Sequence, residues 1–163
     1  MSPRTILVVA EPFGKALGAV EVAAAIGRGL CSDPSLKVDP CALQGPAYRL
    51  ERTAKDPGGP AELRTSLDAV NLDARLRSAR AVVIAAERLD RHTLLRRGAV
   101  FEVATRARQG GVPCYAVAAH NTLDLFEARI LDLQIVLEAG KKPGLRVAGS
   151  RLARTICLTR IVA

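Results

Sequence analysis

Three uninterrupted apolar runs constrain the fold of this chain more than any other feature. They lie at Thr5–Ala10, Ala81–Ala86 and Val112–Ala119. An unbroken apolar run of this length is typical of a strand that is covered on both faces. Such strands belong to parallel sheets, because the crossover between two parallel strands places a helix against the sheet. The chain is therefore expected to form an α/β fold.

Segments with helical spacing of apolar residues separate these strands. Helices are expected at Ala19–Leu30, Ala61–Ser78, Leu94–Gln109, Leu123–Leu131 and Leu145–Cys157. Weaker strand patterns occupy Leu36–Leu43 and Leu133–Leu137, and Pro40 favours an edge position for the first of them. Strands that alternate with helices predict a three-layer αβα sandwich with a mostly parallel sheet, of the Rossmann or flavodoxin-like kind. A length of 163 residues suits one such domain.

The charge of the chain bears on its partners. The formal net charge is +8, which suits a small anionic ligand. The arginines are scattered, and aromatic residues make up only 3% of the chain, so nucleic acid is not expected as a partner. No apolar run reaches eighteen residues and no secretory signal is evident. A cytoplasmic protein without a membrane partner is therefore expected.

The cysteines do not form a recognisable metal motif. None of the four has the Cys-x-x-Cys spacing, and neither histidine lies at a zinc-finger distance from them. No metal-ligating residues are therefore predicted, and the thiols are expected to be reduced.

A charged segment, Glu87–Thr93, follows the apolar run Ala81–Ala86 and precedes the third expected helix. Open α/β sheets bind ligands at the carboxyl ends of their strands, where such a segment would lie. The same residues could equally form a solvated loop with a basic helix start. A ligand-binding or catalytic role for Glu87–Thr93 is therefore a hypothesis.

Two segments resemble the glycerate kinases of the two-domain type that lacks a Walker motif. That family has a motif like Ala-Pro-Asp-Ser-Phe-Lys-Gly-Ser-Leu-Ser-Ala-x-Glu after its first strand. The corresponding run here is Ala10–Glu21, in which Phe13, Leu17, Ala19 and Glu21 match. A second family motif, Thr-Gly-Glu-Gly-Arg-x-Asp-x-Gln-Thr, resembles Ala85–Thr93 with one glycine missing.

The chain also departs from the family. Glu11 stands where the family has Asp, Gly14 stands where it has Lys, and Lys15 is the nearest basic residue. The family's Asp-Gly-Gly-Glu-Gly-Thr segment is absent. Family members are about twice as long because a second domain is inserted in them. Residues 1–163 are thus expected to form a single glycerate-kinase-like domain, in which 44–60 is a linker at the place of that insertion.

The resemblance implies roles for seven residues. Asp90 and Glu87 are the implied catalytic residues. The implied substrate-binding residues are Glu11, Phe13, Lys15, Arg88 and His92.

Structural alternatives exist for several of these residues. Asp90 could simply cap the following helix, and Lys15 could be a solvated loop residue. Glu87 and Arg88 could form a surface ion pair that contributes little to stability. His92 and the strand-end His120 could be ordinary polar loop residues.

The expected function follows from what remains of the family pattern. A kinase of this type closes two lobes over its substrates to exclude water, and here one lobe is missing. We expect a domain without full kinase activity that retains a site for an anion, a small organic acid or a nucleotide, and that self-associates to cover the open cleft. One alternative is an active ATP-dependent glycerate kinase, completed by a dimer partner or another chain, which would use ATP and magnesium. Another is a protein-interaction or structural module.

Overall fold

The computed structural model describes residues 5–44, 59–95 and 98–162. The described strands are β1 (Thr5–Ala10), β2 (Lys37–Ala42), β3 (Ala79–Leu89), β4 (Cys114–Asn121) and β5 (Leu133–Glu138). The described helices are α1 (Ala19–Leu30), α2 (Gly59–Ala69), α3 (Leu72–Ser78), α4 (Arg91–Leu95), α5 (Ala99–Gln109), α6 (Leu125–Ile130) and α7 (Lys142–Val162). The predicted linker at 44–60 lies almost entirely outside the described residues.

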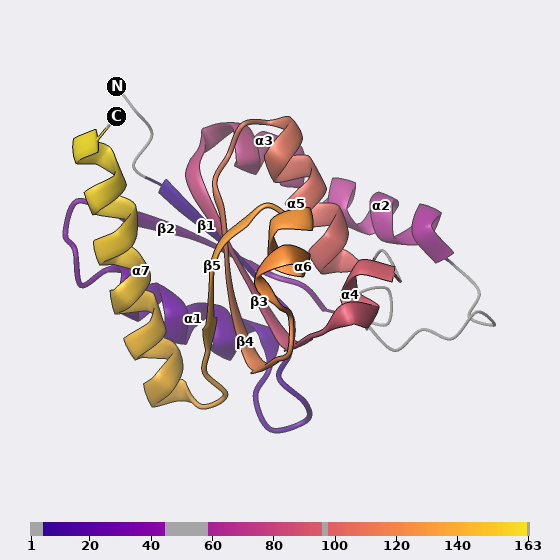
Figure 1. Ribbon diagram of the computed structural model, residues 1–163, viewed down its shortest axis with the longest axis horizontal. Coiled ribbons are helices and arrows are strands. Elements are labelled where there is room, and N and C mark those ends of the chain that lie inside the picture. The colour runs from indigo at the N-terminus through magenta and orange to yellow at the C-terminus, as the bar shows by residue number, and fades with distance from the viewer. Residues whose placement is uncertain (1–4, 45–58, 96–97, 163) are drawn as a thin grey trace.

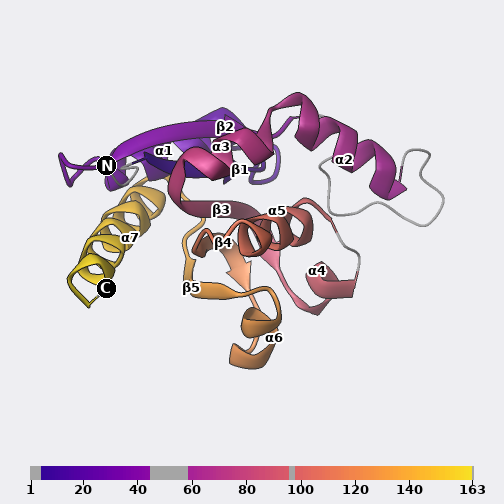
Figure 2. The same ribbon diagram turned by 90° about the horizontal axis from the view of Figure 1, so that it is seen from above.

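The strands form one parallel sheet in the order β2-β1-β3-β4-β5 (Figure 1). Helices α1 and α7 cover one face, and α2, α3 and α5 cover the other (Figure 2). This confirms the predicted αβα sandwich of the flavodoxin-like kind. The strand order reverses between β1 and β3, and ligand crevices of such sheets lie at this position.

The apolar runs Thr5–Ala10 and Ala81–Ala86 lie in the inner strands β1 and β3, because both faces of these strands are covered. Side chains of β1 and β3 alternate between two core clusters, one beneath each helical layer, and nearly all of them are buried. The strand β2 lies at the edge of the sheet as Pro40 predicted, because proline lacks the N–H that an inner strand would use.

Two predicted helices are interrupted in the structure. The expected helix at Ala61–Ser78 is two helices, α2 and α3, which are separated at Asn71 in the left-handed conformation (φ 55°). The expected helix at Leu94–Gln109 is also two helices, because α5 begins only after Gly98, whose backbone is extended.

Helix α7 packs along α1 at very short range. A Cβ atom on Gly29 would lie 2.0 Å from the Arg146 carbonyl oxygen, and one on Gly149 would lie 2.3 Å from that of Ile26. Ser150 Oγ donates a hydrogen bond to the Gly29 carbonyl across this contact (3.3 Å). The two glycines therefore permit the close approach of the helix backbones.

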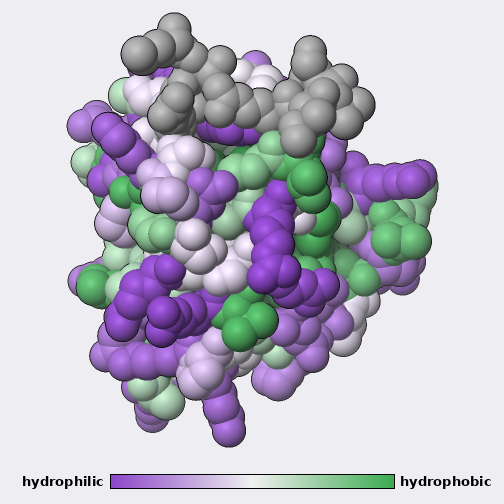
Figure 3. All heavy atoms as spheres, turned by 90° about the vertical axis from the view of Figure 1, so that its left-hand side faces the viewer, coloured by the Kyte–Doolittle hydropathy of each residue, from purple (hydrophilic) through white to green (hydrophobic). Residues whose placement is uncertain are grey.

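The outer surface of this helical layer is mixed in character. Hydrophilic side chains cover most of the face on which α7 lies, with hydrophobic ones in smaller patches between them (Figure 3). Among the described helices, none is both long enough and apolar enough to cross a lipid bilayer.

Candidate functional site

The carboxyl ends of β1 and β3 bring two acidic residues together. Glu11 follows β1 directly, and its backbone N–H donates to the Ala85 carbonyl of β3 (2.9 Å). Glu87 lies near the end of β3, which continues past the predicted limit at Ala86. Because parallel strands end at the same edge, both carboxyl groups lie beside the reversal in strand order.

Glu11 is an unusual buried carboxyl group. Its side chain is only 5% exposed, and Oε1 has no hydrogen-bond partner among the described residues. Burial, and to a smaller extent the Glu87 carboxylate, raises the pKa of Glu11 to about 8. Glu11 is thus mostly protonated at neutral pH and can donate a hydrogen bond.

The loop after Glu11 passes close to Glu87. Phe13 and Leu17 are buried and form a bridge in which the Phe13 N–H donates to the Leu17 carbonyl (2.8 Å). Gly14 has a positive φ of 60°, and a Cβ atom there would lie 3.2 Å from Glu87 Oε1. Since Phe13 packs in the core cluster beneath α1 and α7, its position favours a role in shaping the loop. Its predicted contact with a substrate stays a prediction.

Three of the predicted substrate-binding residues are basic. Lys15, Arg88 and His92 are exposed, and within the described part of the chain none of them makes a hydrogen bond or ion pair with Glu11 or Glu87. Arg88 follows Glu87 on the strand and lies opposite His120 of β4. Lys15 follows Gly14 in the loop that passes close to Glu87, which makes it the cation best placed for a ligand at this edge.

Asp90 caps α4, which is the structural alternative to a catalytic role. Its Oδ1 accepts a hydrogen bond from the Thr93 N–H (3.2 Å), and its own N–H donates to Thr93 Oγ1 (3.1 Å). These reciprocal bonds fix the start of α4. The resemblance to glycerate kinases implies a catalytic role for Asp90 beside Glu87. The hydrogen bonds between Asp90 and Thr93 explain the position of Asp90 without a ligand.

Substitutions at Asp90 can separate the two roles. Asp90→Asn retains a capping oxygen and should change the free energy of unfolding by less than about 0.5 kcal/mol, whereas Asp90→Ala should lower it by about 1 kcal/mol. Urea denaturation measures both values. Equal losses in the two variants would show that the cap is not what Asp90 contributes.

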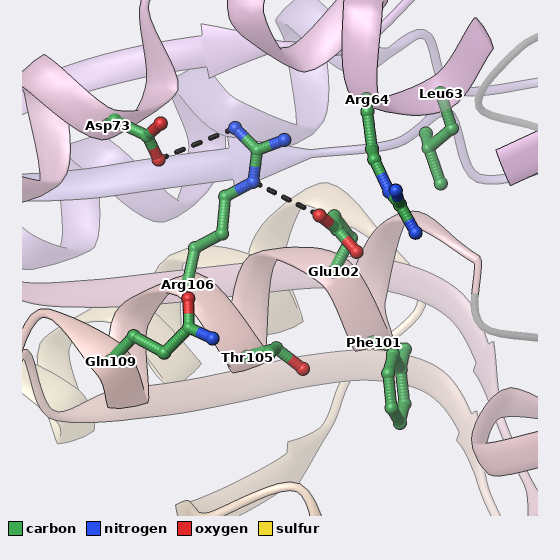
Figure 4. Close-up of a pocket in the computed structure, with 8 residues that line it drawn as sticks. All are labelled: Leu63, Arg64, Asp73, Phe101, Glu102, Thr105, Arg106 and Gln109. Carbon is green, nitrogen blue, oxygen red and sulfur yellow. Dashed lines mark hydrogen bonds and ion pairs between the residues drawn. The ribbon is translucent and has the colours of Figure 1, made fainter. Parts of the chain in front are cut away.

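A separate surface pocket of about 400 Å³ lies between α2, α3 and α5 (Figure 4). It shares no residue with the strand-end site. Its lining consists of Leu63, Arg64, Asp73, Phe101, Glu102, Thr105, Arg106 and Gln109. Arg106 is at its centre and contacts Asp68 (2.8 Å), Asp73 (3.4 Å) and Glu102 (3.2 Å).

The contacts of Arg106 indicate that the residues of this pocket have a structural role. Three carboxylates on three helices surround the guanidinium, whose side chain is 13% exposed. Its charge is therefore already neutralised and is not available to an anionic ligand. The cluster attaches α2 and α3 to α5. No motif spacing in the sequence points to these residues, because they meet only in the folded chain.

Comparisons with known proteins support the α/β fold and do not identify a function. No family model matches the chain, and no curated protein matches it. A pilus assembly-related protein of Burkholderia pseudomallei has 17% identity and a TM-score of 0.51, over 94% of this chain and 91% of that one. At this identity the likeness shows a shared α/β fold alone.

Two further solved structures have lower TM-scores. Glycerate kinase 2 of Salmonella typhimurium has 19% identity and a TM-score of 0.46, over 61% of this chain and 27% of that one. The flavodiiron core of Flv1 from Synechocystis has 11% identity and a TM-score of 0.49, over 95% of this chain and 36% of that one. The chain thus spans about a third or less of these longer proteins. It is an α/β protein of the flavodoxin-like kind, and its resemblance to glycerate kinases stays a prediction.

Proposed function

We propose that this chain is a glycerate-kinase-like domain that binds a small organic acid or a nucleotide at the carboxyl ends of β1 and β3, without full kinase activity. The observation that carries the proposal is the buried carboxyl group of Glu11, whose Oε1 lacks a partner among the described residues. A buried polar atom without a hydrogen bond costs folding free energy, so its retention points to a ligand that supplies the bond.

The chemistry of the pair suits a ligand with both a hydroxyl and an acidic group. Protonated Glu11 can donate to a ligand oxygen, and the side-chain oxygens of Glu87 can accept from a hydroxyl. Lys15, in the loop beside Glu87, offers a cation for a carboxylate or phosphate. With Glu11 neutral, only one of the two carboxyl groups opposes an anionic ligand.

The contacts of the site also support the absence of full kinase activity. Phosphoryl transfer depends on positioned carboxylates for magnesium and on exclusion of water. Asp90, one of the implied catalytic residues, is engaged with Thr93. The inserted second domain of the family, which would close over the reactants, is missing from the sequence at 44–60.

Calorimetric titration with glycerate and with ATP-magnesium tests this proposal. We expect the chain to bind one of them, and Glu11→Leu to weaken that binding at least about tenfold, because it removes the hydrogen-bonding group at similar volume. The binding should also weaken above pH 8, where Glu11 ionises and repels the anion. Gln109→Ala, in the pocket beside α5, is the matched control and should bind like the wild type.

The outcomes separate the hypotheses. Absence of binding to both ligands, or unchanged binding by Glu11→Leu, would contradict the proposal. A coupled phosphorylation assay on the same samples distinguishes the enzyme alternative. Turnover of glycerate that is lost in Glu87→Gln would show an active kinase instead.

A further inference from the structure

The outer side of helix α7 is strongly basic. Its 21 residues include no acidic residue. In the neighbouring helix α1 the only acidic residue is Glu21, which forms an exposed ion pair with Lys142 (3.4 Å). Five exposed basic residues lie along α7 or directly before it, namely Lys141, Lys142, Arg146, Arg151 and Arg154. The layer that α1 and α7 form therefore has an excess of positive charge.

The arginines of α7 lack the partners that arginines on the other side of the sheet have. Arg75 and Arg106 both form ion pairs with carboxylates. In the part of the chain that the structure describes, by contrast, the side chains of Arg146, Arg151 and Arg154 form neither an ion pair nor a hydrogen bond. Their charge is not used within the fold, so it is available to an anionic partner.

The stability of the helix does not explain these basic residues. The N-terminus of a helix carries a partial positive charge and favours acidic side chains. Helix α7 nevertheless begins with Lys142, directly after Lys141, and has no acidic residue in its first turn. Like charges four residues apart, as at Lys142 and Arg146, also destabilise a helix slightly. The basic residues thus oppose the local stability of α7, which points to a role in binding.

Two exposed apolar side chains lie in one row with two of these arginines. Val147, Arg151, Arg154 and Leu158 follow one another at intervals of four, three and four residues, which places them on one side of the helix. These four residues form the α7 stripe. Val147 and Leu158 are 59% and 62% exposed, and Figure 3 shows the mixed character of this face. A partner of the stripe must therefore accept cationic and apolar groups side by side.

We propose that the α7 stripe, together with the basic residues beside it, binds the surface of a lipid membrane that contains anionic phospholipids. The guanidinium and ammonium groups bind the headgroup phosphates, and Val147 and Leu158 reach the boundary of the acyl chains. Clusters of roughly four to eight basic residues are typical of such surfaces. Binding of this kind is reversible, and salt screens it.

The position of α7 permits this contact. The helix lies at the edge of the molecule in both ribbon views (Figure 1, Figure 2). Its inner side is buried through residues such as Leu145, Leu152 and Ile156, so the stripe faces outward. At 1.5 Å per residue the helix is about 30 Å long. A flat surface can therefore contact several of its turns at once.

Nucleic acid fits the stripe less well than a membrane does. Phosphates would neutralise the arginines, but they offer no apolar surface to Val147 and Leu158, and the stripe has no aromatic side chain for stacking on bases. Binding to a membrane surface requires no apolar run of eighteen residues, whose absence led us to expect no membrane partner. The stripe shares no residue with the proposed ligand site at Glu11, so the two proposals can fail separately.

Co-sedimentation of the full chain with lipid vesicles tests the proposal. We expect binding to vesicles of phosphatidylcholine and phosphatidylglycerol in equal parts, and at least about tenfold weaker binding to vesicles of phosphatidylcholine alone. The binding to the anionic vesicles should also fall at least about tenfold when the ionic strength is raised from about 0.1 M to about 1 M, because the charges are then screened.

Charge reversal in the stripe should reduce the binding. We expect Arg151→Glu with Arg154→Glu to weaken binding to the anionic vesicles at least about tenfold, since two attractive charges become repulsive. Arg77→Glu with Arg129→Glu is the matched control, because it changes the net charge equally at exposed residues of α3 and α6. It should bind within about twofold of the wild type, since distant charges are screened. Thermal denaturation verifies that both variants are folded.

Substitution of the apolar residues separates a lipid surface from other anionic partners. Val147→Ser with Leu158→Ser should weaken binding to the anionic vesicles at least about threefold, because it removes the groups that reach the acyl chains. The proposal is overturned by absence of binding to these vesicles, by equal binding to both kinds of vesicle, by unchanged binding in the serine variant, or by equal weakening in the control. Tighter binding to a DNA duplex or to polyglutamate than to the anionic vesicles would also overturn it, in favour of nucleic acid or an acidic protein.

Discussion

Replacing Glu11 with glutamine is expected to remove most of the pH dependence of stability between pH 4.5 and 8. In the unfolded chain this carboxyl group titrates near its ordinary pKa of 4.5, whereas in the folded chain its pKa is raised to about 8. Between these values the folded state binds the additional proton, so the free energy of unfolding of the wild type falls as the pH rises. Its contribution is greatest below pH 4.5 and is lost as the pH rises through 8.

The size of the effect follows from the raised pKa. Each pKa unit corresponds to about 1.4 kcal/mol, so ionisation of Glu11 lowers the stability of the wild type by roughly 5 kcal/mol across this window. Glu11→Gln retains the shape and cannot ionise. It should therefore match the wild type below pH 4.5 and exceed it by several kcal/mol above pH 8.

Urea denaturation across the pH range measures this difference without any ligand. Glu87→Gln is the informative comparison, because it removes the smaller Coulombic cause and leaves the burial of Glu11 unchanged. It should flatten the profile only in part. A wild-type profile that is already flat would show that Glu11 is accessible to water in solution.

The strands could be predicted from the sequence because their apolar period is a local property. The run Thr5–Ala10 is the strand β1 with the same limits, and helix α1 also has its predicted limits. The interruption of the predicted helix at Asn71 could not be predicted, because apolar residues on both sides keep the helical spacing while one left-handed residue turns the chain.

The sequence predicts that the third strand ends at Ala86, whereas β3 continues to Leu89. Charged residues such as Glu87 and Arg88 favour a loop in a sequence, but here β3 continues through both of them and still pairs with β4 at Arg88 and Leu89. Arg88 lies opposite His120, and Leu89 lies opposite Asn121. The side chains of Glu87 and Arg88 are exposed there, so the charges do not oppose the strand.

The candidate site could be located from the sequence only in part. Parallel strands end at one edge, which is why Glu11 and Glu87 could be placed together. The burial of Glu11 could not be anticipated, because it depends on a loop held by Phe13 and Leu17. The position of Asp90 before a helix is compatible with a catalytic residue and with a helix cap. Only the two hydrogen bonds between Asp90 and Thr93 in the folded chain favour the cap. The exposure of the α7 stripe likewise depends on which side of the helix packs against the core.

Substituting alanine at either glycine of the α1–α7 contact is expected to destabilise the fold strongly. A Cβ atom on Gly29 would lie 2.0 Å from the Arg146 carbonyl oxygen and 2.8 Å from the Ser150 nitrogen, which are backbone atoms that cannot rotate away. The helices must separate, which loses packing along their whole contact. We expect Gly29→Ala and Gly149→Ala each to lower the free energy of unfolding by about 3 kcal/mol.

The sign of this effect distinguishes close packing from helix propensity. Alanine is preferred over glycine in a helix by about 1 kcal/mol, so a glycine without a tight neighbour should give the opposite result. Gly144 in α7 is the matched control, because a Cβ atom there would lie 3.4 Å from the Ala139 side chain, at ordinary contact. Gly144→Ala should therefore raise the free energy of unfolding by up to about 1 kcal/mol. If chemical denaturation gave the same sign for all three variants, the two helices would not approach each other through Gly29 and Gly149, and the packing of α7 on the sheet would have to differ from that described above.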